Sequence, residues 1–267
     1  MRLLNILKED NIIKVSPDNH LSSGLAKLTT SHDAAFVFDE NKNFLGAVNP
    51  YHCLIRSSYP GSTKIRHCLV HPPKIYLNYS LAKVINLLIQ SKIHYLPVFD
   101  EQERFLGVIS ARRVLSYLKT LPIYQDKVER LLKNKKRPPL VIYEDETIAK
   151  AHDLFRKTKI SKLIVIDREM KLKGVLSYYD LISILDLPKQ KPEKGGREGN
   201  KVRIFRQKVR NFMKNYVLTL TSDKPLSSVI NLILEKKIGS VIIIDRERHP
   251  TGIITTRDIF QYFLIKE

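Results

Sequence analysis

The sequence predicts an α/β fold of four repeated βαββα units arranged as two pseudo-symmetric tandem pairs. The first observation is a recurring frame, in which an apolar run ends in Asp, Gly follows seven residues later, and a polar residue follows three residues after Gly. The frame occurs at Asp39, Gly46 and Asn49, at Asp100, Gly107 and Ser110, at Asp167, Gly174 and Ser177, and at Asp245, Gly252 and Thr255. The same spacing would not occur four times by chance, so the chain contains internal repeats.

The second observation is that each frame lies within the same order of predicted elements. Leu81, Val84, Ile85 and Leu88 have the spacing of one apolar helix face. The predicted elements of the first two units are 12–15, 21–30, 34–38, 45–48 and a helix from Asn49, followed by 75–77, 81–88, 95–99, 105–109 and 114–118. Those of the last two units are 141–143, 148–154, 163–166, 172–176 and 181–185, followed by 217–220, 226–233, 239–244, 252–255 and 259–264.

The size of the unit predicts how the units combine. A unit of about 45 residues cannot bury its apolar sheet face alone, whereas two units that face each other can. We therefore expect residues 1–130 to form a first pair and residues 131–267 to form a second pair. Within the second pair, residues 187–210 are expected to be a flexible basic insertion, because 187–200 combine Gly and Pro with many charges.

Three local expectations accompany this organisation. Residues 1–11 have the composition of a helical lead-in, and residues 201–213 have that of a basic amphipathic helix. Pro97 favours an edge position for its strand or a break in the pairing of that strand, because proline cannot donate a hydrogen bond to a neighbouring strand.

Composition limits the class of protein. The chain has 267 residues, of which 43% are hydrophobic, and no apolar run approaches the ~20 residues of a membrane span. The N-terminus becomes charged too soon for a secretory signal. Two cysteines give no disulfide framework, so we expect a cytoplasmic location.

The positive charge is concentrated in two connecting segments. The formal net charge is +19, of which residues 119–140 contribute +5 and residues 187–210 contribute +7. Such segments are typical of solvated linkers, and they also allow binding to nucleic acid or another polyanion.

The polar positions of the last two units allow two interpretations. Ser177 with Asp180 and Thr255 with Asp258 have the spacing of a capping box, which stabilises a helix N-terminus without any ligand. The same helix N-terminus offers free N–H groups and a partial positive charge to a phosphate. A carboxylate one turn into the helix can also accept both hydroxyls of a ribose.

The repeats resemble cystathionine-β-synthase (CBS) domains, which occur in tandem pairs. The residues that carry the resemblance are Ile93 to Asp100 with Phe105 to Ser110, Lys173 to Asp180, Phe212 to Thr219, and Gly252 to Asp258. The resemblance covers nearly the whole chain except the linkers. It is specific for fold and less informative about function, because one fold serves many partners.

The resemblance implies an adenosine ligand, bound in the cleft of the second pair. AMP, ADP or ATP is the expected ligand, ahead of S-adenosylmethionine and NAD. In the third unit the residues expected to bind it are Tyr143, Ser161, Lys162, Ser177, Tyr178 and Asp180. In the fourth unit they are Thr219, Gly239, Ser240, Val241, Thr255, Thr256, Arg257 and Asp258.

The first pair departs from this pattern. His52 and Arg113 replace the acid, and Asn49 followed by Pro50 removes the hydroxyl. Neither His52 nor Arg113 accepts ribose hydroxyls as a carboxylate does, although Arg113 could contact a phosphate. We expect the first pair to be a structural or partner-binding half, or to bind a different anion.

Catalytic and metal-binding patterns are not found in the sequence. His52 with Cys53, and His67 with Cys68 and His71, lack the ligand spacing of a zinc site. No glycine-rich phosphate loop or nucleophile elbow occurs. We therefore expect no catalytic residue, no metal and no enzyme.

Two functions remain open from the sequence. One is a non-catalytic regulatory module that senses an adenine nucleotide and acts on an unidentified protein partner, as a monomer or a homodimer. The alternative is a protein that binds nucleic acid or another polyanion through the basic segments 119–140 and 187–210. The intact Asp180 and Asp258 favour the first, and the net charge favours the second.

Overall fold

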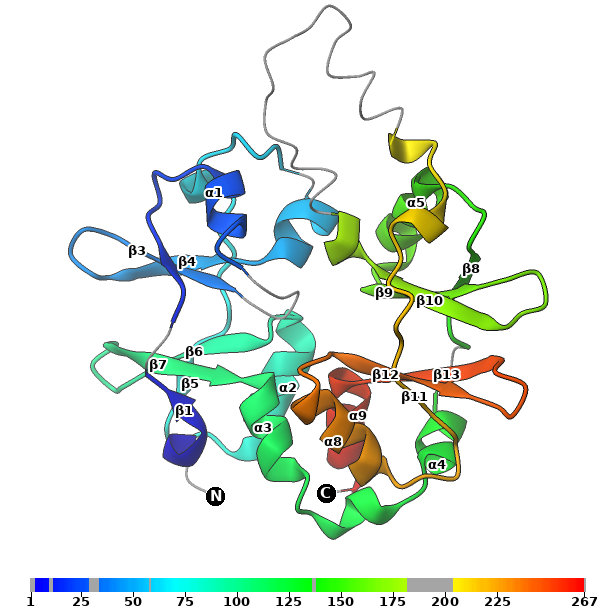
Figure 1. The fold of residues 1–267 in the computed structure, drawn as a ribbon. Helices are drawn as coiled ribbons and strands as arrows, with labels where there is room; N and C mark the ends of the chain where they lie inside the picture. Colours follow the sequence, from blue (N-terminus) through cyan, green and yellow to red (C-terminus); the bar gives the residue numbers. More distant parts are fainter. Residues whose placement is uncertain are drawn as a thin grey trace, which may run out of the picture.

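The computed structural model of the protein describes residues 3–9, 12–28, 34–57, 59–135, 138–181 and 204–266. These residues form four small sheets, one in each corner of the view in Figure 1, with helices between them. The first and second units lie on one side of the molecule, and the third and fourth units lie on the other. Most of the predicted insertion at 187–210 lies outside the described residues.

All four sheets share one topology. The strands of the first two units are β2 (Lys14–Val15), β3 (Ala35–Phe38), β4 (Phe44–Val48), β5 (Ile75–Tyr76), β6 (Tyr95–Phe99) and β7 (Phe105–Ser110). Those of the last two units are β8 (Val141–Tyr143), β9 (Lys162–Ile166), β10 (Leu172–Ser177), β11 (Thr219–Leu220), β12 (Ser240–Ile244) and β13 (Pro250–Thr255). In each unit the short first strand runs parallel to the central strand, and the third strand runs antiparallel to it. The predicted repetition is therefore confirmed, with β3, β6, β9 and β12 as equivalent central strands.

Within the described residues the helices follow the predicted order, and the predicted helix at 181–185 lies outside them except for its first residue. The α-helices are α1 (Leu21–Leu25), α2 (Leu81–Ser91), α3 (Ala111–Leu118), α4 (Val128–Lys133), α5 (Ile148–Thr158), α8 (Leu226–Glu235) and α9 (Thr256–Lys266). A π-helix, η2 (Tyr51–Arg56), follows β4, and five short 3-10 helices are η1 (Leu3–Ile6), η3 (Ile65–His67), η4 (Pro122–Gln125), η5 (Tyr178–Leu181) and η6 (Val209–Asn211). Local sequence determines several of their starts, since Ser80, Ser110 and Thr147 each cap a helix through the side-chain hydroxyl.

Units one and two face each other through aromatic side chains. Phe38 and Phe44 of the first unit contact Phe105 of the second unit, with ring centroids 5.1 Å and 6.0 Å apart. Units three and four face each other through aliphatic side chains, in a cluster that contains Ile164 and Ile242. Each pair therefore buries the apolar sheet faces that a single unit would expose.

The two pairs meet within this one chain. Helices α2 and α3 of the second unit pack against α8 and α9 of the fourth unit in a shared core (Figure 1). On the other side, Tyr51 of η2 packs against Tyr178 of the third unit, with ring centroids 5.9 Å apart. Both contacts are apolar and buried, so the four units form one body.

The glycine of the recurring frame has a packing role. At Gly107 an added Cβ would lie 2.4 Å from the Lys8 carbonyl oxygen, and at Gly46 it would lie 2.9 Å from that of Val70. At Gly174 it would lie 2.8 Å from the Lys214 carbonyl oxygen. In each case the chain that leads into the sibling unit passes over the third strand, and only glycine leaves room for it. We call these stretches, which contain Lys8, Val70 and Lys214, the lead-in segments. The lead-in segment of the third unit is 128–135, whose Leu132 lies beside Gly252.

Gly174→Ala is expected to lower the free energy of unfolding by about 2 kcal/mol, because the new methyl group would lie 2.8 Å from the Lys214 carbonyl oxygen, which is backbone that cannot move aside. Gly252→Ala is the matched control, since its Cβ would lie 2.7 Å from the Leu132 side chain, which can change rotamer. Urea denaturation of both variants measures the difference. Equal losses would show that the backbone of the lead-in segment does not cause the requirement for glycine.

The N-terminal lead-in differs from the predicted helix. Among residues 3–9, the described part of the lead-in, only Leu3–Ile6 is helical, and Leu7 and Lys8 then form β1, which pairs antiparallel with Ile109 and Val108 at the edge of β7. The reason is tertiary: the edge of β7 offers unpaired backbone groups, and burial of Leu7 fixes the segment there.

Of the two predictions for Pro97, the edge position is wrong, because β6 is central between β7 and β5, and the break in pairing is confirmed on the β5 side. The short β5 pairs only with Val98 and Phe99, so it has no residue opposite Pro97. The missing N–H of Pro97 therefore removes no hydrogen bond from that side of the sheet.

The basic helix predicted over 201–213 is not continuous in its described part. Residues 204–205 are helical, the chain turns at 206, and residues 209–211 form the separate 3-10 helix η6. The backbone N–H of Val209 donates to the Glu146 carbonyl oxygen at 2.8 Å, and that of Arg210 donates to the Glu144 carbonyl oxygen at 3.0 Å. These bonds tie the segment to the third unit and replace the bonds of a continuous helix.

Candidate functional site

Both predicted capping boxes are formed. Ser177 donates from its backbone N–H and its hydroxyl to Asp180 Oδ2, at 2.8 Å and 2.6 Å, and the Asp180 N–H donates back to Ser177 Oγ at 3.3 Å. Thr255 and Asp258 repeat this arrangement, with distances of 2.8, 2.7 and 3.3 Å. The capping interpretation therefore accounts for one carboxylate oxygen of each acid.

The other oxygen of each acid contacts a lysine. Asp258 Oδ1 lies 2.8 Å from Lys135 Nζ, and Asp180 Oδ1 lies 3.3 Å from Lys214 Nζ. Both acids are largely buried, whereas the Lys214 side chain is 71% exposed. Both lysines belong to lead-in segments, so each acid is joined to the lead-in of its sibling unit.

These two lysines were missed from the sequence. Lys214 lies within Phe212 to Thr219, one of the stretches that carry the family resemblance. The sequence therefore contained a signal that this residue could lie near the ligand site. Lys135 has no comparable signal, because it lies more than 100 residues from Asp258 within a basic segment that is typical of a linker.

Four polar residues form a continuous row between the two acids. Ser177 is the β10 partner of Lys162, and Ser240 is the β12 partner of Thr255. Lys162 Nζ donates to Ser240 Oγ at 2.9 Å and so joins the two sheets. Since Lys162 and Ser240 both begin central strands, the two units meet here through equivalent positions. The row brings Asp180 and Asp258 to the end of both sheets at which β9 and β12 begin.

The row has an unusual lysine. Burial lowers the pKa of Lys162 from 10.5 to about 8, the nearby Asp180 opposes this shift, and Lys214 adds to it. An anion that approaches Lys162 would favour its charged form. The position is therefore suited to a negatively charged group of a ligand.

Backbone positions of the fourth unit lie beside this row. Gly239 precedes β12 and is buried, and Val241 follows Ser240 on that strand. Thr219 of β11 is paired with Ile242, two residues along β12 from Ser240, and is half-buried. These three predicted residues are thus placed near the row by the sheet itself.

Other predicted residues lie elsewhere. Tyr143 pairs with Ile166 at the far end of β9 from Lys162, and its hydroxyl lies 3.8 Å from Met170 Sδ. Tyr178 is buried against Phe155, and burial raises its pKa.

The remaining predicted residues lie at the start of α9 and before β9. Thr256 is buried and lines a small cavity of about 20 Å³ that it shares with the second unit. Arg257 and Ser161 are exposed, and the Ser161 carbonyl oxygen accepts from the Tyr178 N–H at 3.2 Å.

In the first pair, the residues at the positions of Asp180 and Asp258 contact backbone carbonyl groups of the sibling unit. His52 Nε2 lies 3.1 Å from the Ser91 carbonyl oxygen, and burial lowers the pKa of His52. Arg113 donates to the carbonyl oxygen of Leu7 in the N-terminal lead-in. Both substitutions therefore hold the two units together where the second pair uses a carboxylate and a lysine.

The cysteines pack within the first unit. Cys53 and Cys68 are both buried in its core, and the Cys53 thiol donates to the Cys68 carbonyl oxygen at 3.6 Å.

Ligand atoms of Asp245, Glu247 and His249 lie within 4.8 Å of one another in the β12–β13 turn, where His249 already contacts Asp245 at 3.1 Å. Across the described ranges, no helix is both long enough and apolar enough to span a membrane.

The fold and this site define a protein of paired βαββα units that join through the starts of their central strands. The family model for the CBS domain matches residues 65–120, 132–187 and 209–265. These ranges make up more than half of the sequence, so the chain belongs to the CBS domain family. Residues 12–64 lie outside the matched ranges.

Several proteins are similar to this chain. An uncharacterised protein of Methanocaldococcus jannaschii is 26% identical over 62% of this chain and 39% of its own length. The 5'-AMP-activated protein kinase subunit gamma-3 of Sus scrofa is 24% identical over 70% of this chain and 37% of its own length. The chain thus spans well under half of either relative.

A solved structure confirms the fold. It is a Methanocaldococcus jannaschii protein named as an archaeal homologue of the AMPK γ subunit, with a TM-score of 0.78 and 15% identity. The likeness covers 98% of this chain and 100% of that chain. It therefore includes the first unit, which the family model does not match.

Proposed function

We propose that the protein is a non-catalytic regulatory module that binds AMP, ADP or ATP between the sheets of the third and fourth units. The observation that carries this proposal is the row of Ser177, Lys162, Ser240 and Thr255, with a largely buried carboxylate at each end. Hydroxyl groups, a buried cation and two carboxylates complement the ribose and phosphate of a nucleotide.

The lysines define how a nucleotide would enter. Ribose hydroxyls would replace Lys135 or Lys214 at Oδ1 of each carboxylate, while Oδ2 keeps its capping bonds. The displaced lysine can then pair with a phosphate of the same ligand, since Lys214 is mostly exposed and can swing. The N-terminus of α9 adds a partial positive charge on the same side.

The carboxylates also set the choice among nucleotides. A ribose that carries a 2′-phosphate would place two negative groups together, which disfavours NADP. Lys162 favours a phosphorylated ligand over adenosine. S-adenosylmethionine is disfavoured because its positive charge would approach Lys162 and the lead-in lysine.

The relatives support an adenine nucleotide and a regulatory role. One is named as a subunit of a kinase that 5'-AMP activates, although the chain covers 37% of it. By analogy, the regulated partner would be a separate protein that recognises the nucleotide-bound arrangement of the pairs. A cytoplasmic location suits both the ligand and the two free cysteines.

We also propose a fourth, degenerate CBS unit at residues 12–64, and a division into pairs at residues 130 and 131. Support for the fourth unit comes from the sheet of β2, β3 and β4, which repeats the topology of the matched units. Its sequence has Asn49 and His52 where the matched fourth unit has Thr255 and Asp258.

The polyanion alternative retains the exposed Lys119 and Lys133 of 119–140, whereas two other cations of this segment are paired. Arg130 pairs with Asp126 at 3.0 Å, and Lys135 pairs with Asp258 at 2.8 Å, so both cations are engaged within the protein. Most of 187–210 lies outside the described residues.

A thermal-shift series tests the proposed ligand. AMP, ADP or ATP at 100 times its Kd is expected to stabilise the native state by about 2.7 kcal/mol, which corresponds to a rise in Tm of roughly 5–10 °C. NADP at the same concentration should give a much smaller rise. The absence of any rise with all three adenine nucleotides would contradict the proposal.

A further inference from the structure

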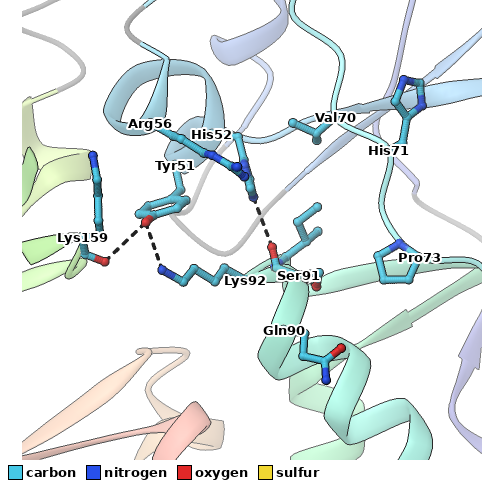
Figure 2. A pocket seen from close by; sticks show the side chains of 11 residues that line it. Tyr51, His52, Arg56, Val70, His71, Pro73, Gln90, Ser91, Lys92 and Lys159 are labelled. Atoms are coloured by element: carbon cyan, nitrogen blue, oxygen red, sulfur yellow. Dashed lines mark hydrogen bonds between the residues drawn. The ribbon is translucent and has the colours of Figure 1, made fainter.

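The first pair has a cavity of its own. It measures about 590 Å³ and is lined by η2, by the lead-in of the second unit, by the C-terminus of α2 and by Lys159 of the third unit (Figure 2). None of the residues predicted to bind a nucleotide lines it. Its volume is typical of a small-molecule site.

The lining of this cavity is cationic. Arg56 comes from the first unit, Lys92 from the second and Lys159 from the third, and His52 and His71 add two imidazoles. None of the described residues that line the cavity is acidic. Among the ion pairs formed by described residues, none involves Arg56, Lys92 or Lys159. Three cations from three units, none of them paired with a described acid, therefore line one space.

Tyr51 contacts Lys92 through the lysine ammonium group and Lys159 through the lysine backbone. Its hydroxyl accepts from Lys92 Nζ at 3.2 Å and donates to the Lys159 carbonyl oxygen at 3.4 Å (Figure 2). Lys92 Nζ also lies 5.1 Å from the centre of the Tyr51 ring. Because Tyr51 is buried and packs on Tyr178, it gives the cavity a fixed wall between the two pairs.

The cavity lacks the group that would recognise a ribose. His52 occupies the position of the acid, and its Nε2 is engaged by the Ser91 carbonyl oxygen. A ligand here must be recognised by charge. Phosphate suits this lining, since lysine and arginine are its usual partners and several can share its oxygens.

We propose that this cavity binds a small anion with two or more phosphate groups and no nucleoside, held by Arg56, Lys92 and Lys159. Such a ligand would connect the first pair to the third unit, because Lys159 lies on the other side of the junction between the pairs. The proposal is independent of the nucleotide site, since neither Asp180 nor Asp258 lines the cavity.

The fold supplies substitutions that remove charge without harming the helices. Lys92 and Lys159 are the C-caps of α2 and α5, both in the left-handed conformation with φ of 56°. Glycine is the preferred residue in that conformation, so Lys92→Gly and Lys159→Gly should preserve the fold. Lys237, which follows α8 with φ of 51°, does not line the cavity and gives the matched control.

Calorimetric titration with inorganic tripolyphosphate tests the proposal. The wild type and Lys237→Gly should bind it equally, and the double variant Lys92→Gly, Lys159→Gly should bind at least tenfold more weakly. Adenosine affinity should be the same in all three proteins. No binding to the wild type, an equal loss in Lys237→Gly, or a parallel loss of adenosine binding would each overturn the proposal.

Discussion

Asp258→Ala is expected to weaken AMP binding by about one to two orders of magnitude. A hydrogen bond to a charged group contributes roughly 1.5–3 kcal/mol, and each 1.4 kcal/mol is a tenfold change in affinity. Asp258 is largely buried and its Oδ1 already contacts Lys135 at 2.8 Å, so this oxygen is positioned for a hydrogen-bond donor. Asp180→Ala should have the same effect at the other end of the row.

The fold should survive both substitutions. Each removes a helix cap and one ion pair, which together cost about 1–2 kcal/mol of stability. Ser80→Ala is the matched control, since Ser80 caps α2 by accepting from the Lys83 N–H at 3.2 Å and lies outside the proposed site. Fluorescent nucleotide displacement should show weaker binding in the two Asp variants and unchanged binding in Ser80→Ala. A similar loss in all three would assign the effect to stability alone.

Lys162→Met is expected to stabilise the protein at pH 7 while weakening its binding of AMP. In the folded state the pKa of Lys162 is about 8, against an ordinary value of 10.5. The unfolded chain therefore binds more protons between these two values, so the free energy of unfolding rises with pH from about 8 to 10.5. Below pH 8 the folded state bears the full cost of a buried charge, up to about 3 kcal/mol.

Methionine removes this cost but leaves Ser240 without its partner, so we expect a net gain of about 1–2 kcal/mol at pH 7. The gain should disappear above pH 10.5, where the wild-type lysine is neutral in both states. Urea unfolding of both proteins at pH 7 and pH 10.5 measures it, and Ser240→Ala combined with Lys162→Met controls for the orphaned hydroxyl. If the free energy of unfolding had the same pH dependence in wild type and variant, burial would not destabilise the charged form of Lys162.

The sequence predicted the features that depend on local spacing. The frame of Asp, Gly and a polar residue fixed the topology, because apolar runs of strand length and a glycine under a crossing segment recur with each unit. The capping boxes were predictable for the same reason, since Ser177 and Asp180 are only three residues apart.

Features that depend on distant segments were not predictable. Lys135 reaches Asp258 only because the lead-in of the third unit crosses the fourth. Tyr178 was predicted beside a ligand, yet its side chain packs into the core against Tyr51 and Phe155, a direction that sequence spacing does not reveal. The cavity of the first pair brings together residues from three units, so no local pattern could indicate it.

A crystal structure of the protein with bound AMP tests the nucleotide proposal most directly. We predict ribose hydroxyls at hydrogen-bond distance, about 2.5–3.0 Å, from Oδ1 of Asp180 or Asp258. The lysine that now contacts that oxygen should have moved toward the phosphate, while the capping bonds of Oδ2 remain. AMP bound elsewhere, with Lys135 and Lys214 still on their carboxylates, would show that the two acids serve only to cap helices and anchor the lead-in segments.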